Sequence, residues 1–513
     1  MHLGLRWRTI PNGADAARRA IVPRMDRTRG RASKLSLPLA GHPRLGLMER
    51  RTPMAGKTVK LLKVGLFFLP IAVLVGLACI YYTVDEPPPE DADLLPQRVA
   101  IPREENGFFH VKLAWEDFSW KTPDKGAAGK PEAASLSGES SDDGSEEEMA
   151  PDDVEERIWS MLQGEEAWDQ AFAAAILEAN RRILEQLDKA LSAPRFEFEP
   201  LPNTSAPITH LRGFMALSSI QRLKARLELE AGREARAVSE TLKLIRLGHR
   251  AEEGKGCGFE TAVAAEIASR GLEDLTDLVR RTGMGPDQLR PLLEELPRYH
   301  MTEEAFKESL KTEYSLTGRS LEELGVEKLA DYYLMPGPSW FSRRLCFKPN
   351  ATRRLYAEGF RAIRNELSAP PGKREKVDFD ALSGGRVGWF PGRNRVGRSL
   401  FQVAMPLMER QLLRSRVGRE LRLSFLRVLI ALKCHKLSKG SFPRSLEELV
   451  PEFLPEVPLD PYDGKPLRYS ADEKILYSIG ADLEEAGGAA RDYYGEGAED
   501  TSEPTLRLEM PSS

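Results

Sequence analysis

Cysteine is scarce in this chain, with four residues in 513. They are Cys79, Cys257, Cys346 and Cys434, and none stands in a CxxC pair or beside histidines at the spacing of a zinc site. This pattern argues against a structural metal site. Cys79 lies in an apolar run, which leaves three cysteines and room for one disulfide at most. We expect these three to be buried free thiols.

Motifs of catalysis are also missing. The seven histidines are scattered without an HExxH pair, no GxSxG occurs, and no GxGxxG follows a strand pattern. The strongest nucleophile is Cys257 in "GKGCGFE", where a helix N-terminus can lower a thiol pKa. The simpler interpretation is a small residue at a helix start. Cys434 and His435 point about 100° apart on a helix, which argues against a dyad. The sequence therefore predicts no catalytic residue.

A few charged residues allow a functional and a simpler interpretation. Glu260 and Glu266 lie in an Ala-rich helical pattern, and Glu313 precedes an aromatic residue. Buried acids can be functional, and the simpler interpretation is solvent exposure or a salt bridge. A basic cluster in "FSRRLCFKPNATRR" can hold an anionic polymer or the acidic linker, or can be solvated surface. Its members are Arg343, Arg344, Lys348, Arg353 and Arg354.

A strong net charge is lacking, because 74 basic residues face 78 acidic ones for a net charge of −4. No bulk field favours nucleic acid, so we expect no nucleic-acid partner. The charge is instead segregated along the chain. Residues 1–53 are basic, and we expect a disordered cytoplasmic arm, or a start of translation at Met54. Residues 121–152 are acidic with almost no large apolar side chains, and we expect a disordered linker.

One long apolar run, residues 64–82, contains no charged residue. At about 1.5 Å per residue, a helix of this length just crosses a hydrocarbon core of about 30 Å. Basic residues precede the run and acidic residues follow it, so the positive-inside rule places the N-terminus in the cytoplasm. We expect a single-pass signal anchor in a bacterial inner membrane, with the bulk of the chain extracytoplasmic. The alternatives are a cleaved signal peptide and lipoprotein processing at Cys79.

The remainder is predicted to be mainly α-helical. Residues 83–97 are an acidic, Pro-rich spacer, and residues 98–120 form a short ordered segment. Apolar residues then recur at helical spacing through residues 153–439, interrupted by signals such as "TGMGP" and "LMPGPSW". These features predict an irregular multi-helix extracytoplasmic domain. We expect residues 499–513 to be a disordered tail.

Residues 440–498 differ from the helical part in their closely spaced Pro, Asp, Gly and Tyr. A short helix over 446–450 cannot continue past Pro451, Pro455 and Pro458. "DPYDG" predicts a turn, "PLRYS" a strand, and "KILYSIG" its partner strand. The expected product is a small β-hairpin packed against the long preceding helix.

This tail resembles the C-terminal region of the major pseudopilin of type II secretion over about a tenth of the chain. The matching residues are Pro443, Leu446, Leu449, Leu454, Pro455, Val457, Pro458, Asp460, Pro461, Gly464, Pro466, Tyr469, Tyr477, Ser478, Gly480, Ala481 and Asp482. Pseudopilins begin with a cleavage site followed by Phe and a Glu on the filament helix, whereas the apolar run here has no acid. Assembly into a filament is therefore not expected. The overall layout also resembles membrane-anchored envelope proteins of planctomycete and verrucomicrobial bacteria.

The pseudopilin tail binds calcium through oxygen ligands, and the resemblance carries this expectation to Asp482. Asp492 or Asp500 in the following acidic loop would complete such a site. The alternative is an acidic, solvated loop. Calcium is the one cofactor that the sequence suggests.

These observations favour a membrane-anchored scaffold or protein-interaction module of the bacterial envelope, without a defined biochemical activity. One alternative is an envelope hydrolase whose carboxylates converge only in the fold. Another is an accessory component of a secretion apparatus. A hydrolase requires polar residues that meet in a concave pocket with perturbed pKa values, whereas a scaffold requires an exposed groove or apolar patch.

Overall fold

The computed structural model describes residues 69–116 except 79, residue 118, and residues 151–323, 325, 328–329, 346–369, 373–385, 392–488 and 503–509. The chain divides into two compact units, Met1–Ala72 and Val73–Ser513. Only residues 69–72 of the first unit are described, and they are helical. The site and the fold discussed below belong to the second unit.

Residues 69–78 and 80–83 are helical, and their apolar side chains are mostly exposed. Leu74, for example, is 65% exposed. Residues 64–68 and Cys79 of the predicted anchor lie outside the described residues. Within the described part of the chain, no helix is both long and apolar enough to span a membrane.

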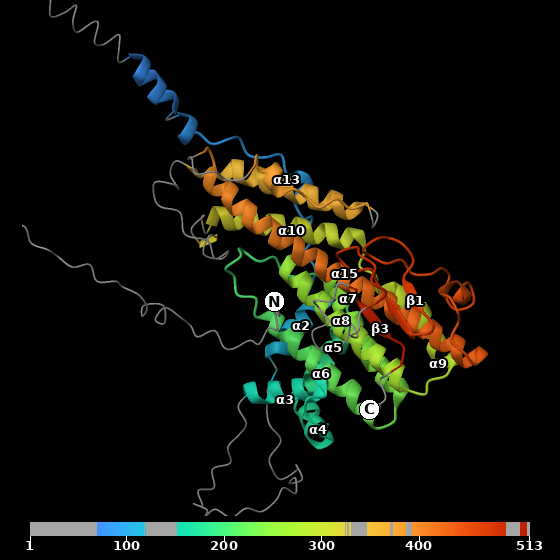
Figure 1. Ribbon diagram of the computed structural model, residues 1–513. Coiled ribbons are helices and arrows are strands. Elements are labelled where there is room, and N and C mark those ends of the chain that lie inside the picture. The colour runs from blue at the N-terminus through green and yellow to red at the C-terminus, as the bar shows by residue number, and fades with distance from the viewer. Residues whose placement is uncertain are drawn as a thin grey trace, which may run out of the picture. The chain divides into compact units, whose positions relative to one another are not determined.

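The expectation of a mainly helical chain with a small C-terminal β element is confirmed (Figure 1). The α-helices are α2 (Gly107–Glu116), α3 (Pro151–Gln163), α4 (Gln170–Ala179), α5 (Arg181–Ser192), α6 (His210–Glu230), α7 (Glu234–Glu252), α8 (Gly258–Arg281), α9 (Pro286–Glu295), α10 (Glu303–Glu323), α13 (Pro349–Ser368), α14 (Phe379–Leu382) and α15 (Arg395–Lys439). Short 3₁₀ helices are η1 (Ala92–Leu94), η2 (Arg103–Glu105), η3 (Leu296–Tyr299) and η4 (Leu446–Leu449).

Helices α6, α7 and α8 form the centre of the unit. Gly232 adopts a φ of +71° in the turn between α6 and α7, a conformation that favours glycine. Gly248 then brings α7 against α8, since an added Cβ would lie 2.5 Å from the backbone N of Ala268. Small residues at this crossing therefore set how closely the two helices pack.

Helix α15 is 45 residues long and takes part in two hydrophobic cores. Its N-terminal half contributes Leu400 and Phe401 to a core with α10 and α13. Its C-terminal half contributes Phe425 and Leu429 to a core with α7, α8, α9 and the tail. Gly440, with a φ of +85°, ends the helix in the left-handed conformation typical of helix C-termini. At about 1.5 Å per residue, α15 runs for about 65 Å and joins the two cores.

The tail folds into a three-stranded antiparallel sheet in the order β1-β2-β3. β1 (Arg468–Ser470) and β2 (Ile475–Tyr477) make the expected hairpin. β3 (Thr505–Arg507) is an addition, and it arises from the segment 499–513 that we expected to be disordered. Leu506 and Leu508 alternate with the exposed Arg507 and Glu509, and both leucine side chains are buried in the core. This alternation gives the final segment a buried face and therefore a reason to fold.

Asp460, in the "DPYDG" turn, connects the turn to the sheet. Its side chain is fully buried, and it accepts hydrogen bonds from the Ser478 hydroxyl at 2.9 Å and the Ile479 N–H at 2.8 Å. The guanidinium of Arg468 donates at 2.9 Å to Oδ2, the oxygen that also accepts the Ile479 N–H. Asp460 and Ser478, both matched by the pseudopilin resemblance, thus help to hold the tail together.

Candidate functional site

The strongest nucleophile suggested by the sequence, Cys257, lies immediately before α8 and is buried. Its N–H donates to Glu260 at 2.8 Å, and the N–H of Gly258 donates to Glu313 at 2.7 Å. Burial, together with these two carboxylates, raises the pKa of the Cys257 thiol well above its usual value. The carboxylates therefore cancel the effect of the helix N-terminus, and the thiol is not activated.

Both carboxylate oxygens of Glu260 form hydrogen bonds in the interior. Its second oxygen lies 2.8 Å from Nε2 of His210, and both side chains are buried. The His210 ring packs against Phe108 and Phe198. The Glu260 pair therefore supports the packing of α6 against α8. Glu266 is exposed and pairs with Arg270 at 2.9 Å, which is the simpler of its two interpretations.

The calcium prediction falls only partly on described residues. Asp482 is exposed, and its Oδ1 accepts the N–H of Glu484 at 3.2 Å. Asp492 and Asp500 lie outside the described residues. Among the residues that are described, no three His, Cys, Asp or Glu side chains are grouped to hold a metal ion. A calcium site at Asp482 therefore stays a prediction.

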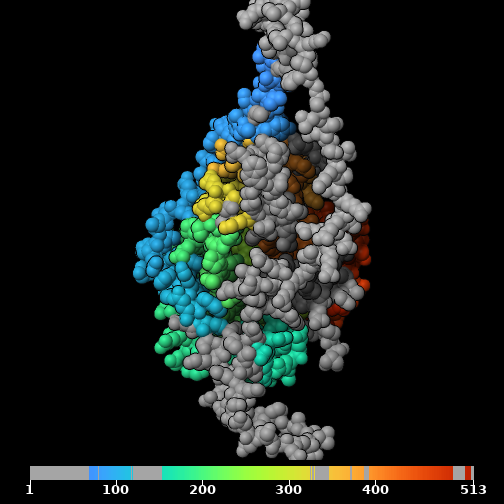
Figure 2. All heavy atoms as spheres, turned by 90° about the vertical axis from the view of Figure 1, so that its left-hand side faces the viewer, coloured from blue at the N-terminus to red at the C-terminus, as the bar shows by residue number. Residues whose placement is uncertain are grey.

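The basic cluster around residue 350 contacts an acidic segment of the same chain. Residues 84–93, here called the strap, lie within the predicted spacer and run along α10 and α13 (Figure 2). Its ion pairs are Glu86–Arg354 at 3.2 Å, Asp91–Arg353 at 3.2 Å, Asp93–Arg361 at 2.6 Å and Asp93–Arg364 at 3.1 Å. Arg343 and Arg344 lie outside the described residues. A segment predicted to be an acidic, Pro-rich spacer is thus fastened to the domain.

Contacts also join the end of the apolar helix to the domain. Lys348, itself buried, donates its ammonium group to the carbonyl of Tyr82. Arg393 donates to the carbonyl of Val84 at 3.2 Å, and its guanidinium lies 5.6 Å from the centre of the Tyr81 ring. Asp85 caps the first turn of α13. The transition from apolar helix to strap is therefore a fixed joint.

A second feature was not predicted and lies on α15. Glu409, Arg416, Glu420 and Arg427 follow each other at spacings of seven, four and seven residues. At about 100° per residue, these spacings keep all four within about 20° of one line along the helix. An ionisable stripe therefore runs along a helix that also contributes side chains to two cores.

The stripe borders a cavity of about 370 Å³ between α15, the residues after η3 and the tail. We call this cavity the arginine cleft. Its charged lining residues are His300, Arg374, Arg416, Glu420, Arg427, Glu456 and Asp460. They come from four segments separated by long stretches of sequence, so the site exists only in the folded chain.

The acids of the arginine cleft are partly neutralised by neighbours. Glu420 pairs with His300 and lies 3.2 Å from Arg419, and it accepts the N–H of Met301 at 3.1 Å. Burial alone would raise the pKa of Glu420, but His300, Arg419 and the N–H of Met301 together outweigh burial and lower the pKa. Asp460 is held by Arg468. Glu456 is exposed at the rim.

The arginines of the cleft are poorly neutralised. Burial lowers the pKa of Arg374, of Arg416 and of Arg427 below the usual value for arginine. Nη1 of Arg416 and Nε of Arg427 are buried without a hydrogen-bond partner. A buried hydrogen-bond donor without an acceptor destabilises the folded chain. A ligand that supplies acceptor atoms would therefore be favoured in the cleft.

Three acids, Glu252, Glu366 and Glu409, lie in or beside the stripe. Glu252 is fully buried and 2.8 Å from the buried guanidinium of Arg419. Burial raises the pKa of Glu252, and Arg419 opposes the rise. Glu366 on α13 and Glu409 on α15 face each other, and burial with this carboxyl neighbour raises the pKa of Glu366 to about 7. Several ionisable groups in and beside the stripe are therefore shielded from water.

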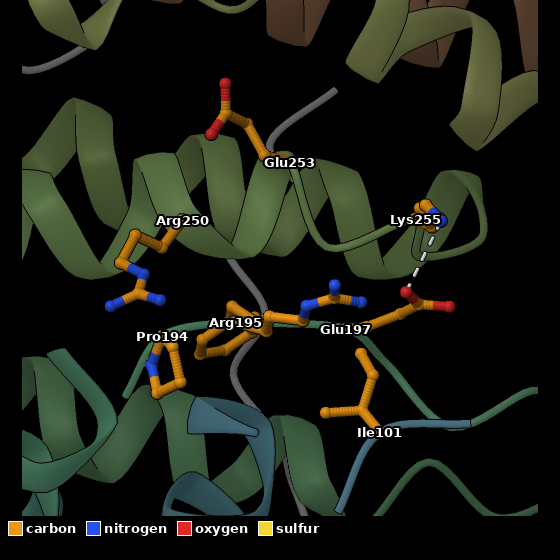
Figure 3. A pocket seen from close by; sticks show the side chains of 8 residues that line it. Ile101, Pro194, Arg195, Glu197, Arg250, Glu253 and Lys255 are labelled. Atoms are coloured by element: carbon orange, nitrogen blue, oxygen red, sulfur yellow. Dashed lines mark ion pairs between the residues drawn. The ribbon is translucent and has the colours of Figure 1, made fainter. Parts of the chain in front are cut away.

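A second cavity, of about 310 Å³, is more balanced in charge. Figure 3 shows Lys255 paired with Glu197 across it, at 3.4 Å. Arg250 donates to the carbonyls of Leu191 and Ala193, so its positive charge has acceptors within the chain. This cavity lacks the unpaired donors that distinguish the arginine cleft.

Comparisons of the chain with protein-family models, curated proteins and solved structures found no match. The pseudopilin resemblance therefore rests on its residues alone. The fold and the site define the chain as a helical unit with a small sheet, a fastened strap and a basic cleft.

Proposed function

We propose that this protein is a membrane-anchored scaffold or protein-interaction module of the bacterial envelope, with its N-terminus in the cytoplasm. The observation that carries the proposal is the exposed apolar helix ending at residue 83, which leads directly into the strap. Exposed side chains of this kind are costly in water and suit a hydrocarbon environment.

The fixed joint supports a role as a scaffold. Lys348 and Arg393 bind carbonyls at the end of the apolar helix, and the strap ion pairs continue along α13. A flexible tether would let the domain explore a wide volume, whereas this joint keeps it beside the anchor. A module held in this way presents its surfaces at a set distance from the bilayer.

The topology is tested with an alkaline phosphatase fused to the C-terminus of the full chain, because this enzyme is active only outside the cytoplasm. We expect an active fusion in the membrane fraction. A matched fusion after residue 60, before the apolar run, serves as the cytoplasmic control. An inactive full-length fusion overturns the proposal.

Partners are tested by crosslinking intact cells and purifying the full chain from the membrane. Recovery of envelope proteins by the wild type and a reduced recovery with Arg353→Gln and Arg361→Gln together support the scaffold. Co-purification of secretion proteins would assign the chain to a secretion apparatus. Recovery of no envelope protein would contradict an interaction module.

A hydrolase is a second candidate because Ser424 lies one helical turn after Glu420 and lines the same cavity as Glu420 and His300. A hydroxyl, an imidazole and a carboxylate are the groups used by serine hydrolases. The test is labelling of the full chain with a fluorophosphonate probe, with Ser424→Ala as control. Labelling that disappears in the variant supports the hydrolase, and absence of labelling argues against it.

A further inference from the structure

We propose that the arginine cleft binds a phosphate monoester, with the phosphate dianion between Arg374 and Arg416 and the organic part extending toward Arg427 and Glu456. The proposal concerns the ligand of this cavity and does not depend on membrane anchorage.

The first argument is the lack of partners at Arg416. In the described part of the chain, no carboxylate lies within ion-pair distance of Arg374 or Arg416. The guanidinium of Arg416 lies 5.1 Å from the centre of the Phe306 ring, and its Nη1 has no acceptor. Neighbouring arginines of α15 differ: Arg419 pairs with Glu252 at 2.8 Å, and Arg422 with Glu273 at 2.7 Å.

The second argument is that the acids near Arg416 already form ion pairs or hydrogen bonds with other residues. Glu303 pairs with Lys307 at 2.7 Å, and Glu252 pairs with Arg419. Glu420 is held by His300 and Arg419. Arg374 and Arg416 are close enough to lower each other's affinity for a proton, as the pKa of Arg374 reflects. Glu366 near Arg374 offsets part of this charge, and this end of the cleft keeps an excess of positive charge.

The third argument concerns the class of ligand. A phosphate monoester carries about −1.5 to −2 charges at neutral pH, which matches the two arginines, and a planar guanidinium binds its oxygens in a bidentate manner. At the other end Arg427 lies near the opposite charge of Glu456, so no further anion is required there. A hydroxyl group on the ligand can accept a hydrogen bond from Arg427 and donate one to Glu456.

The fourth argument is size. The cavity of about 370 Å³ falls at the lower end of the range for small-molecule sites, about 300–1,000 Å³. Met301, Pro458 and Leu459 supply an apolar wall beside the charged groups. A small phosphate monoester fills this space, whereas a large cofactor does not.

The proposal is tested by titration calorimetry of the purified full chain in detergent, with inorganic phosphate and glycerol 3-phosphate as probes. We expect saturable binding of both, tighter for glycerol 3-phosphate. Arg416→Gln should weaken binding at least tenfold. Arg414→Gln is the matched control, because Arg414 is exposed and lies about 200° around the same helix. This control should leave the affinity unchanged.

A measurement of stability distinguishes an arginine that binds a ligand from one that supports the fold. Arg416→Gln removes a poorly partnered charge, so its unfolding midpoint should equal or exceed that of the wild type. A folded Arg416→Gln that binds the probes as tightly as the wild type overturns the proposal. Absence of saturable binding, or equally tight binding of succinate, also overturns it. Binding only to vesicles that contain phosphatidic acid would assign the same phosphate chemistry to a lipid headgroup.

Discussion

The carboxylate of Asp85 accepts the backbone N–H of Asn350 at 2.8 Å, across 265 positions of sequence. Asn350 belongs to the first turn of α13, where N–H groups lack partners within the helix. Helix caps are normally the residue just before the helix, but Lys348 occupies that position here and forms no side-chain cap. The strap therefore supplies from a distance what the local sequence does not.

Replacement of Asp85 by Ala should lower the free energy of unfolding by about 1–2 kcal/mol, because the cap of α13 is lost. The measurement is chemical denaturation of the full chain in detergent. Glu90→Ala is the matched control, since Glu90 is an exposed acid of the same strap. An equal effect of both variants would show that net charge, rather than the cap, stabilises the joint.

Asp93 should titrate at unusually low pH. Its hydrogen bond to Arg361, with help from Arg364, lowers the pKa of Asp93 to about 2. Its contribution to stability is present above the pKa of an unfolded Asp, about 3.9, and is lost as the pH falls through about 2. Because the side chain is 44% exposed, solvent screening limits this contribution to less than about 1 kcal/mol. Carbon NMR titration of Asp93 should return to a midpoint near its ordinary value in the double variant Arg361→Gln, Arg364→Gln.

The Glu366–Glu409 pair predicts an opposite dependence on pH. With a pKa of about 7, folded Glu366 keeps a proton that the unfolded chain releases near pH 4.5. The stabilising effect is complete below pH 4.5 and is lost as the pH rises to about 7, by about 2–3 kcal/mol in total. Glu366→Gln should therefore raise stability at pH 8 and flatten this part of the pH profile.

The control for that experiment is Glu358→Gln, an exposed acid on the same helix. Unfolding free energies of wild type and variants are measured from pH 5 to 8. If Glu366→Gln keeps the slope of the wild type, the two carboxyl groups do not share a proton in the folded chain.

The contributions of Arg419 and Glu252 to the free energy of unfolding should be strongly coupled. Their exposed fractions are 1% and 0%, so Arg419→Met leaves a buried acid without its cation. We expect a loss of about 3–5 kcal/mol in unfolding free energy, and recovery of most of it when Glu252→Leu is added. A double-mutant cycle measures the coupling. Arg422→Met, at a more exposed ion pair, should cost about 1 kcal/mol or less.

Asp460 should control the folding of the tail. Asp460→Ala removes the acceptor of Ile479, of Ser478 and of Arg468 in a buried site, which should cost about 2–4 kcal/mol. Hydrogen exchange should accelerate at Ile479 and in β2. Asp482→Ala, at an exposed aspartate of the same tail, should change stability by less than about 0.5 kcal/mol. Slow exchange at Ile479 in the Asp460 variant would contradict this role.

Local patterns in the sequence predicted the helices and the hairpin, because helical periodicity and turn residues act over a few positions. β3 was missed because the alternation of Leu506 and Leu508 is short and follows a polar, acidic segment. The strap was missed because acidic, Pro-rich composition is typical of solvated spacers. Its basic partners, such as Arg353 and Arg361, lie more than 250 residues away.

The arginine cleft was harder to predict from the sequence than the strap or β3. The stripe of Arg416, Glu420 and Arg427 was present in the sequence, but it lies beside the apolar seam that dominates α15. His300, Arg374 and Glu456 reach the cleft only through tertiary packing. The pKa of Cys257 was hard to predict for the same reason, since it depends on burial and on Glu313, 56 positions later in the sequence.

The length of α15 has a consequence for how the chain loses its structure. One continuous hydrogen-bonded rod is shared by the core around α10 and α13 and the core around α8 and the tail. Melting either core exposes half of that rod and removes support from the other half. A chain long enough for several domains should therefore unfold the described helices in a single cooperative transition, rather than one core at a time.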